Sequence, residues 1–259
     1  MSEEAPSAPG DEGRRRLPAR ILVLVFVRSL FIQLGFNPRA MQGLGFAYTL
    51  YPALKALYPA GEGRTTALRR HLGLFNTHPY FAAAIVGGAV RIEERIAAGL
   101  ARPQDVTGFR DALAAPLAAI GDAFFWNALR PACALLAALT APTLGLGAIA
   151  VFLGLYNAVH ISVRIWLYIV GYTKADRLIA QIGRAQFPLG TLFLRRAAAV
   201  MAGAVTAELA LFAYRDGGRL ALALVGVAAL AVVALAGRLN SFILIYSALA
   251  LALIAGLLS

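Results

Sequence analysis

The stretch APLAAIGDAFFWNALRP, residues 115–131, decides the class of fold. It is almost entirely apolar, yet it contains Asp122, which is the only acidic residue between Asp111 and Asp176. A carboxyl group among apolar residues needs a polar partner. If the surrounding solvent is lipid, such a residue indicates a functional site by default.

The composition indicates that the solvent is lipid. Hydrophobic residues make up 60% of the 259 residues and charged residues only 14%, whereas soluble domains average about 45–50% and 25%. The chain is long enough for about six to eight membrane-spanning segments of roughly 20 residues. We therefore predict an all-α, polytopic integral membrane protein.

The formal net charge of +11 does not indicate nucleic-acid binding. The arginines are scattered at the ends of apolar runs, without the basic stripe or fold signature of a nucleic-acid-binding protein. That distribution is typical of cytoplasmic loops and of contact with anionic lipid head groups. The single cysteine, Cys133, excludes an internal disulfide, and no Cys and His cluster has metal-ligand spacing. We expect no metal and no cofactor.

The first half of the chain is predicted to consist of short, broken and amphipathic helices. Residues 1–16 are polar and predict a disordered cytoplasmic tail, followed by one membrane domain over residues 17–259. Thr65 or Thr66 is a plausible N-cap for an amphipathic helix that stops before Pro79. Helices are also expected at 21–36, 41–58 and 82–98, and the last of these should leave lipid for water. A loop is expected at 99–108 and a break in the helix at Gly121 and Asp122.

The second half is more uniformly hydrophobic. Residues 124–172 should hold about two helices with a turn near Pro142. An amphipathic segment at 173–184 precedes apolar helices at 192–214, 220–236 and 239–258, of which the last two predict a transmembrane hairpin over about 220–258. Broken segments at membrane depth are tolerated only where protein or a water-filled cavity receives their backbone groups, which favours a transporter over an anchor.

Asp122 has two compatible interpretations. It could be the N-cap of a discontinuous helix, or it could contact a polar substrate at that helix end. Arg130 would lie about 12 Å further along the same helix, so the partner of Asp122 is expected on another segment or subunit. Trp126 could stack on the face of a sugar.

The segment Asn76, Thr77 and His78 carries donors and acceptors suited to sugar hydroxyls, although such residues also dominate polar turns. A single histidine with no adjacent acid is weak support for a phosphorylated nucleophile. Gln42, in an otherwise apolar helix, is either an interhelical contact or a ligand group. We predict no catalytic residue.

Four ordered blocks of sequence resemble the IID membrane component of the mannose/fructose/sorbose phosphotransferase system (PTS) permeases. The similarity runs from about Arg20 to the end. The blocks are MQGLGFAYTLYPALKALY at 41–58, RHLGLFNTHP at 70–79, residues 116–131 with the core GDAFFW, and GYTK at 171–174.

The resemblance implies a multi-pass transport subunit of a bacterial inner membrane, with its N-terminus in the cytoplasm. It would pair with a IIC membrane subunit in a hetero-oligomer that takes up a hexose or amino sugar. Phosphoryl transfer would occur on soluble IIA and IIB partners, so the chain itself is not expected to be an enzyme. The basic residues Arg64, Arg69 and Arg70 are candidates for docking the IIB partner.

Two departures from the family pattern leave alternatives open. The acidic residue usual before the Met-Gln pair is absent from NPRAMQ at 37–42, and the polar segment before the final hairpin is shortened to YRDGGR at 214–219. One alternative is a non-transporting membrane scaffold or sensor that regulates a PTS cascade. Another is a proton-coupled secondary transporter that uses Asp122.

Overall fold

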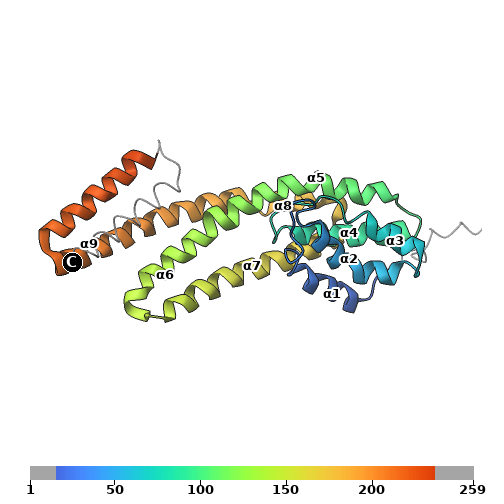
Figure 1. Ribbon diagram of the computed structural model, residues 1–259, viewed down its shortest axis with the longest axis horizontal. Helices are drawn as coiled ribbons and strands as arrows, with labels where there is room; N and C mark the ends of the chain where they lie inside the picture. The colour runs from blue at the N-terminus through green and yellow to red at the C-terminus, as the bar shows by residue number, and fades with distance from the viewer. Residues whose placement is uncertain (1–15, 237–259) are drawn as a thin grey trace, which may run out of the picture.

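The computed structural model describes residues 16–236, with residue 213 and residues 216–236 described by their backbone alone. This part of the chain is built from helices, which confirms the predicted all-α class (Figure 1). The elements are α1 (Ala19–Ser29), α2 (Gly43–Leu57), α3 (Glu62–Arg69), α4 (Ala82–Ala97), α5 (Pro103–Gly121), the π-helix η2 (Asp122–Leu129), α6 (Arg130–Leu144), α7 (Gly147–Thr173), the 3₁₀-helix η3 (Ala175–Arg177), α8 (Leu178–Arg184) and α9 (Phe187–Ala236).

Three helical stretches within the described residues are long and apolar enough to cross a membrane. They are Pro103–Leu144, Gly147–Thr173 and Ala175–Phe212. Only 11% of the most apolar part of the second stretch and 6% of that of the third are buried. Apolar helices with so little protein cover fit a lipid environment, as the composition predicts.

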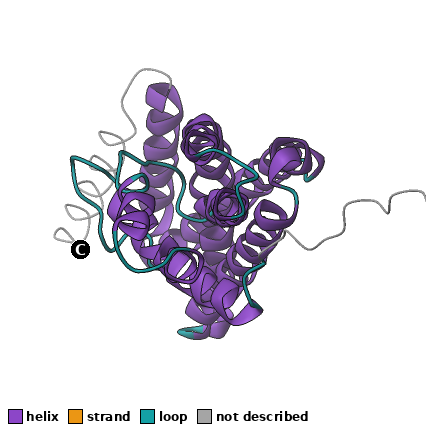
Figure 2. Cartoon of the chain, turned by 90° about the vertical axis from the view of Figure 1, so that its right-hand side faces the viewer, coloured by secondary structure: helices purple, strands orange, loops and turns teal. Residues whose placement is uncertain are grey.

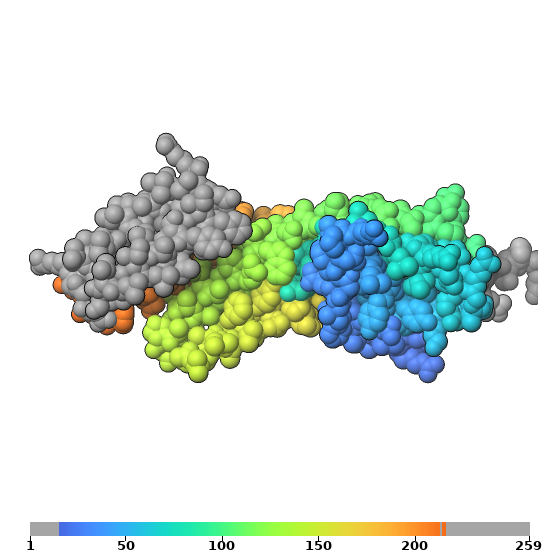
Figure 3. All heavy atoms as spheres, in the orientation of Figure 1, coloured from blue at the N-terminus to red at the C-terminus, as the bar shows by residue number. Residues whose placement is uncertain are grey.

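The helices form a compact part and a long projection. The first four helices gather with α5, α8 and the end of α7 at one end of the molecule, whereas α6, the start of α7 and α9 extend away from it (Figure 1). The filled surface shows the same separation between the N-terminal residues and the projecting hairpin of α6 and α7 (Figure 3). Viewed from the compact end, loops join the helices on several sides (Figure 2).

Helix α4 forms the centre of the compact part. It packs most extensively against α7 and also contacts α1, α2 and α5. Its crossing with α7 depends on two glycines: a Cβ added to Gly87 would lie 2.3 Å from the Tyr168 carbonyl oxygen, and one added to Gly171 would lie 2.1 Å from that of Ala84. Small residues let two helix backbones approach this closely.

Several predicted boundaries in the first half are wrong. Helix α1 stops at Ser29 rather than at residue 36, because the Ser29 hydroxyl donates to the Phe26 carbonyl at 2.6 Å and the chain continues in single turns. Helix α3 starts at Glu62, after Gly61, so Thr65 and Thr66 lie inside it and do not cap it. It ends at Arg69, ten residues before Pro79.

Helix α4 has the predicted extent, but the two acids near its C-terminal end are buried. Glu93 is 0% exposed and Glu94 is 2% exposed. Both carboxylates are buried because they receive hydrogen bonds from other segments. Charge alone therefore gave the wrong environment for these two acids, whereas the side chain of Arg95 on the same turn is 42% exposed.

In the second half, the predicted turn between two helices is confirmed at residues 145–146. The predicted helices at 192–214 and 220–236 form one helix, α9, from Phe187 to Ala236, although its ribbon turns sharply toward the C-terminal end (Figure 1). The predicted tail at residues 1–16 and the second half of the predicted hairpin lie outside the described residues, apart from Arg16.

Candidate functional site

The segment Asn76 to His78 runs between α3 and α4 without regular structure, and Gln42 fixes it. The Gln42 side chain donates from Nε2 to the Thr77 carbonyl at 2.8 Å and accepts from the Thr77 N–H at 3.1 Å. The Gln42 backbone N–H also donates to the Phe75 carbonyl at 2.8 Å. Gln42 is 1% exposed, so its amide is used inside the protein, although its partner is this irregular segment and not another helix as the interhelical interpretation predicted.

This segment carries His78 into a group of aromatic rings. The imidazole stacks on Phe125 at 5.2 Å between ring centroids and 12° between planes, and it lies 4.9 Å from the Trp126 ring. A Cβ added to Gly121 would lie 2.4 Å from the Cβ of His78. The structure thus brings together two segments that the sequence singled out separately.

The predicted break at Gly121 and Asp122 is wrong. Both residues have helical dihedrals, with φ of −64° and −62°, and the helix passes from α5 through η2 into α6. Gly121 is therefore a contact residue for His78 and does not end the helix. The irregularity in this region is the eight-residue π-helix, and π-helical turns often occur at functional sites.

Asp122 is not an N-cap. Its side chain is exposed and makes no cap hydrogen bond. Arg130 is also exposed, and its guanidinium lies 5.0 Å from the centre of the Trp126 ring, so its contact is on its own helix. Asn76 is exposed, whereas Thr77 and His78 are 4% and 1% exposed.

Helix α7 adds three residues that the sequence analysis missed. Tyr156, His160 and Arg164 recur every four residues and share one face of α7. Tyr80 meets this face: its ring stacks on His160 at 4.1 Å, and its hydroxyl lies 3.2 Å from that of Tyr156.

Arg164 completes this arrangement. Its guanidinium lies 5.7 Å from the Tyr80 ring centre and donates to the Ser29 carbonyl at the end of α1. Arg164 is the only Asp, Glu, Lys or Arg in α7 and is 3% exposed. A lone charge in an apolar span was therefore the available signal, as it was for Asp122. We refer to this group as the His78 cluster, formed by Thr77, His78, Tyr80, Phe125, Trp126, Tyr156, His160 and Arg164.

The His78 cluster contains buried polar atoms without a hydrogen-bond partner among the described residues: Thr77 Oγ1, His78 Nε2, His160 Nδ1 and Arg164 Nε. Burial, with a smaller contribution from the charge of Arg164, lowers the pKa of His78 to about 4, so the ring is neutral at pH 7. Its Nδ1 accepts from the Tyr80 N–H at 3.3 Å, which places the proton on Nε2. Neutral donors and acceptors beside aromatic faces can bind an uncharged polar molecule.

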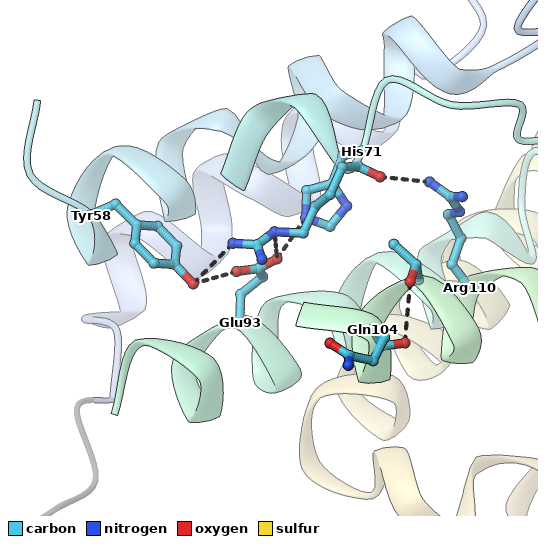
Figure 4. A network of polar contacts seen from close by, with 7 residues as sticks. Tyr58, His71, Glu93, Gln104 and Arg110 are labelled. Carbon is cyan, nitrogen blue, oxygen red and sulfur yellow. Dashed lines mark hydrogen bonds and ion pairs between the residues drawn. The ribbon is translucent and has the colours of Figure 1, made fainter. Parts of the chain in front are cut away.

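A second buried polar group surrounds Glu93 (Figure 4). One carboxylate oxygen accepts from the Tyr58 hydroxyl at 2.6 Å, and the other accepts from His71 Nε2 at 2.7 Å. Arg70 Nε lies 3.1 Å from that second oxygen as an ion pair. Burial raises the pKa of Tyr58 and lowers that of His71, although the Glu93 carboxylate opposes the shift of His71. This group joins α2, α3 and α4, and the sequence analysis did not identify it.

The three arginines predicted to dock a partner are not equivalent. Arg64 donates to the Tyr58 carbonyl at 2.9 and 3.1 Å, and Arg70 contacts Glu93, so both are half-buried and engaged within the chain. Arg69 is exposed. Only Arg69 presents its charge mainly to the outside.

The sequence matches the family described as EIID-AGA, the PTS system mannose/fructose/sorbose family IID component, over residues 16–215. It is 33% identical over 172 residues to the fructose permease IID component of Bacillus subtilis (strain 168), covering 66% of this chain and 62% of that protein. It is 38% identical over 162 residues to the mannose-specific EIID component of Escherichia coli (strain K12), covering 61% of this chain and 57% of that protein. The matched region thus spans about three fifths of the length of these relatives.

The fold is similar to a chain in the cryo-EM structure of the mannose transporter ManYZ in complex with microcin E492. The TM-score is 0.60 at 27% identity, with 93% of this chain and 96% of that chain covered. A second structure, described as a membrane protein, gives a TM-score of 0.67 at 33% identity, with coverages of 74% and 71%.

Proposed function

This chain belongs to the PTS mannose/fructose/sorbose family of IID components, and from that premise we propose that it forms a sugar-translocating complex with a IIC membrane subunit. The complex takes up a hexose or amino sugar in the bacterial inner membrane. Phosphorylation of the sugar takes place on IIA and IIB partners, and the N-terminus of this chain lies in the cytoplasm.

The observation that carries the proposal is the chemistry of the His78 cluster. A sugar offers hydroxyl groups that both donate and accept hydrogen bonds, together with apolar faces that stack on aromatic rings. The cluster supplies buried polar atoms on Thr77, His78 and His160, together with the charged guanidinium of Arg164, beside the rings of Tyr80, Phe125 and Trp126. It lies where the compact part meets the apolar helices η2 and α7.

The residues selected from the sequence take different roles in this proposal. Trp126 and His78 line the pathway, Thr77 adds a hydroxyl, and Gln42 holds the segment in place. The exposed residues Asn76, Asp122 and Arg130 contact the sugar at the edge of the cluster or the IIC subunit beside it.

Of the three arginines predicted to dock IIB, only one is free to contact a partner. Arg69 supplies its exposed charge, whereas Arg64 and Arg70 support the local fold through Tyr58 and Glu93. Exposed charges speed and orient association more than they add affinity. The basic surface around these arginines also faces anionic lipid head groups.

Uptake in cells tests the pathway assignment. Cells that lack mannose-family permeases would produce this chain together with IIC, IIA and IIB proteins of the same family. We expect Trp126→Ala to reduce uptake about tenfold, which corresponds to about 1.4 kcal/mol. Trp166→Ala is the matched control, because Trp166 lies outside the cluster, 6.3 Å from the ring of Phe187.

Three results would contradict parts of this proposal. If both tryptophan variants take up sugar as well as the unaltered protein and still co-purify with IIC, the His78 cluster is not part of the sugar pathway. If Asp122→Asn and Asp122→Ala leave both uptake and assembly unchanged, Asp122 has no part in it. Assembly without uptake in the unaltered protein would instead identify a scaffold or sensor.

A further inference from the structure

A basic pocket of about 550 Å³ lies where the C-terminal ends of α4 and α7 meet the start of the described chain. Its lining includes three guanidinium groups from two places in the sequence: Arg16, and Arg91 and Arg95 one turn apart on α4. Their convergence at one end of two packed helices provides several donors for one anionic group.

The pocket also contains two acids, Glu94 and Asp176, which differ in how far they neutralise the arginines. Glu94 is buried and already accepts from the Leu17 N–H at 2.8 Å, from the Tyr172 hydroxyl at 2.8 Å and from Arg91 Nη1 at 2.7 Å. Asp176 is 84% exposed and lies 3.5 Å from Arg95, and an exposed pair of this kind contributes little. Glu94 therefore holds the pocket together, while Arg95 and Arg16 can turn to an incoming anion.

An apolar groove of about 370 Å³ continues from this pocket between α1 and α7. Its lining includes Leu22, Val23, Phe26 and Ile169, and it shares Thr173 with the basic pocket. Val23 is 60% exposed and Ile169 is 52% exposed. The Tyr168 hydroxyl donates to the Leu22 carbonyl at 2.9 Å and fixes the floor of the groove.

We propose that this composite site binds one anionic glycerophospholipid. The phosphate lies against Arg16 and Arg95, beside the Arg91–Glu94 pair, and an acyl chain lies along the α1–α7 groove. Basic pockets at the polar ends of membrane helices suit anionic head groups, and each nearby Arg adds to the attraction. The groove is apolar and belongs to a span, so an acyl chain occupies it without exposing polar backbone. Neither feature contributes to the His78 cluster, so the proposal stands independently of sugar transport.

Native mass spectrometry of the full chain in detergent tests the site. Phosphatidylglycerol and phosphatidylcholine with the same acyl chains would be titrated against the unaltered chain and a double variant, Arg16→Gln with Arg95→Gln. We expect one phosphatidylglycerol to be retained in preference to phosphatidylcholine, and about a thirtyfold loss of its affinity in the double variant. Arg102→Gln, at an exposed arginine outside the pocket, should bind the lipid as the unaltered chain does.

The groove requires its own variant. Val23→Trp fills it without altering a charge and should also weaken phosphatidylglycerol binding, whereas Leu24→Trp, on the neighbouring exposed face of α1, should not. Competition by millimolar inorganic phosphate alone, with no effect of Val23→Trp, would identify a free-anion site and overturn the proposal. Equal losses with Arg102→Gln and the double variant would also overturn it, because attraction would then be unspecific.

Discussion

At the scale of single residues, the His78 cluster depends on the absence of a side chain at Gly121. The imidazole of His78 occupies the place where a side chain of residue 121 would lie. This contact lets the ring stack flat on Phe125 while Gln42 holds the backbone of Thr77 from the other side. A site built from close contacts of this kind should be sensitive to a single methyl group.

We therefore expect Gly121→Ala to displace His78 and to destabilise the protein by about 1–3 kcal/mol, as overpacking does. Gly108→Ala is the matched control in the same helix, because nothing lies within 4 Å of its added Cβ. That change should be neutral or stabilising by up to about 1 kcal/mol. Thermal unfolding in detergent compares the two variants, and equal melting temperatures would contradict the packing of His78 on Gly121.

The buried His78 also predicts a pH dependence. Burial lowers its pKa to about 4 in the folded protein, below the ordinary 6.5 of an unfolded chain. As pH falls from 6.5 to 4, the unfolded state takes up a proton that the folded state does not, so stability decreases through this window. His71, whose pKa is also lowered, adds to the same trend.

His78→Phe should retain the ring stacking but remove the titrating group. We expect the melting temperature of this variant to fall less between pH 6.5 and 4 than that of the unaltered protein. The remaining fall includes the contribution of His71. Parallel curves for both proteins over this range would show that His78 does not stay neutral in the folded state.

At the scale of elements, the π-helix η2 sets which side chains of the long helix Pro103–Leu144 face the cluster. It places Phe125 and Trp126 toward His78, while α6 continues with Ala132 and Cys133 buried. Helix α6 packs against α7, and η2 packs against α9. The winding of η2 therefore couples the compact part to the projecting helices.

Deleting the exposed residue Asn127 would test this coupling. With the winding of η2 kept, a deletion shifts the residues of α6 by one position, which is a rotation of about 100° on an α-helix with 3.6 residues per turn. We expect Ala132 and Cys133 to leave their contacts and the yield of folded protein to drop severalfold. Asn127→Ala keeps the register and should behave like the unaltered protein in size-exclusion chromatography. Normal yield and uptake after the deletion would show that the winding of η2 is not required.

The elements also show which features the sequence could predict. Apolar length and turn residues identified α2, α4 and the α6–α7 hairpin, because those signals are local. The π-helix was missed since Gly121 and Asp122 have the local signature of a break, and only the distant contact with His78 explains the glycine. Glu93 and Glu94 were placed in water because their partners, such as Tyr58 and Tyr172, are distant in sequence.

At the scale of the whole molecule, the fold leaves long apolar surfaces on α7 and α9 that the rest of the described chain does not cover. Lipid and a IIC subunit are the occupants that our account expects. The family, the helical class and the membrane setting could be predicted from composition and four sequence blocks. The site could be predicted only in part, because Tyr80, His160 and Arg164 converge through the crossing of α4 and α7.

The most direct test of the central claim is sugar uptake into proteoliposomes that contain this chain with its IIC subunit. The IIA and IIB proteins and a phosphoryl donor would be enclosed inside. Our account predicts that sugar phosphate accumulates inside only when this chain, IIC and the phosphocarriers are all present, and that a proton gradient does not replace the phosphoryl donor. Accumulation of free sugar by this chain alone, driven by a proton gradient, would contradict it.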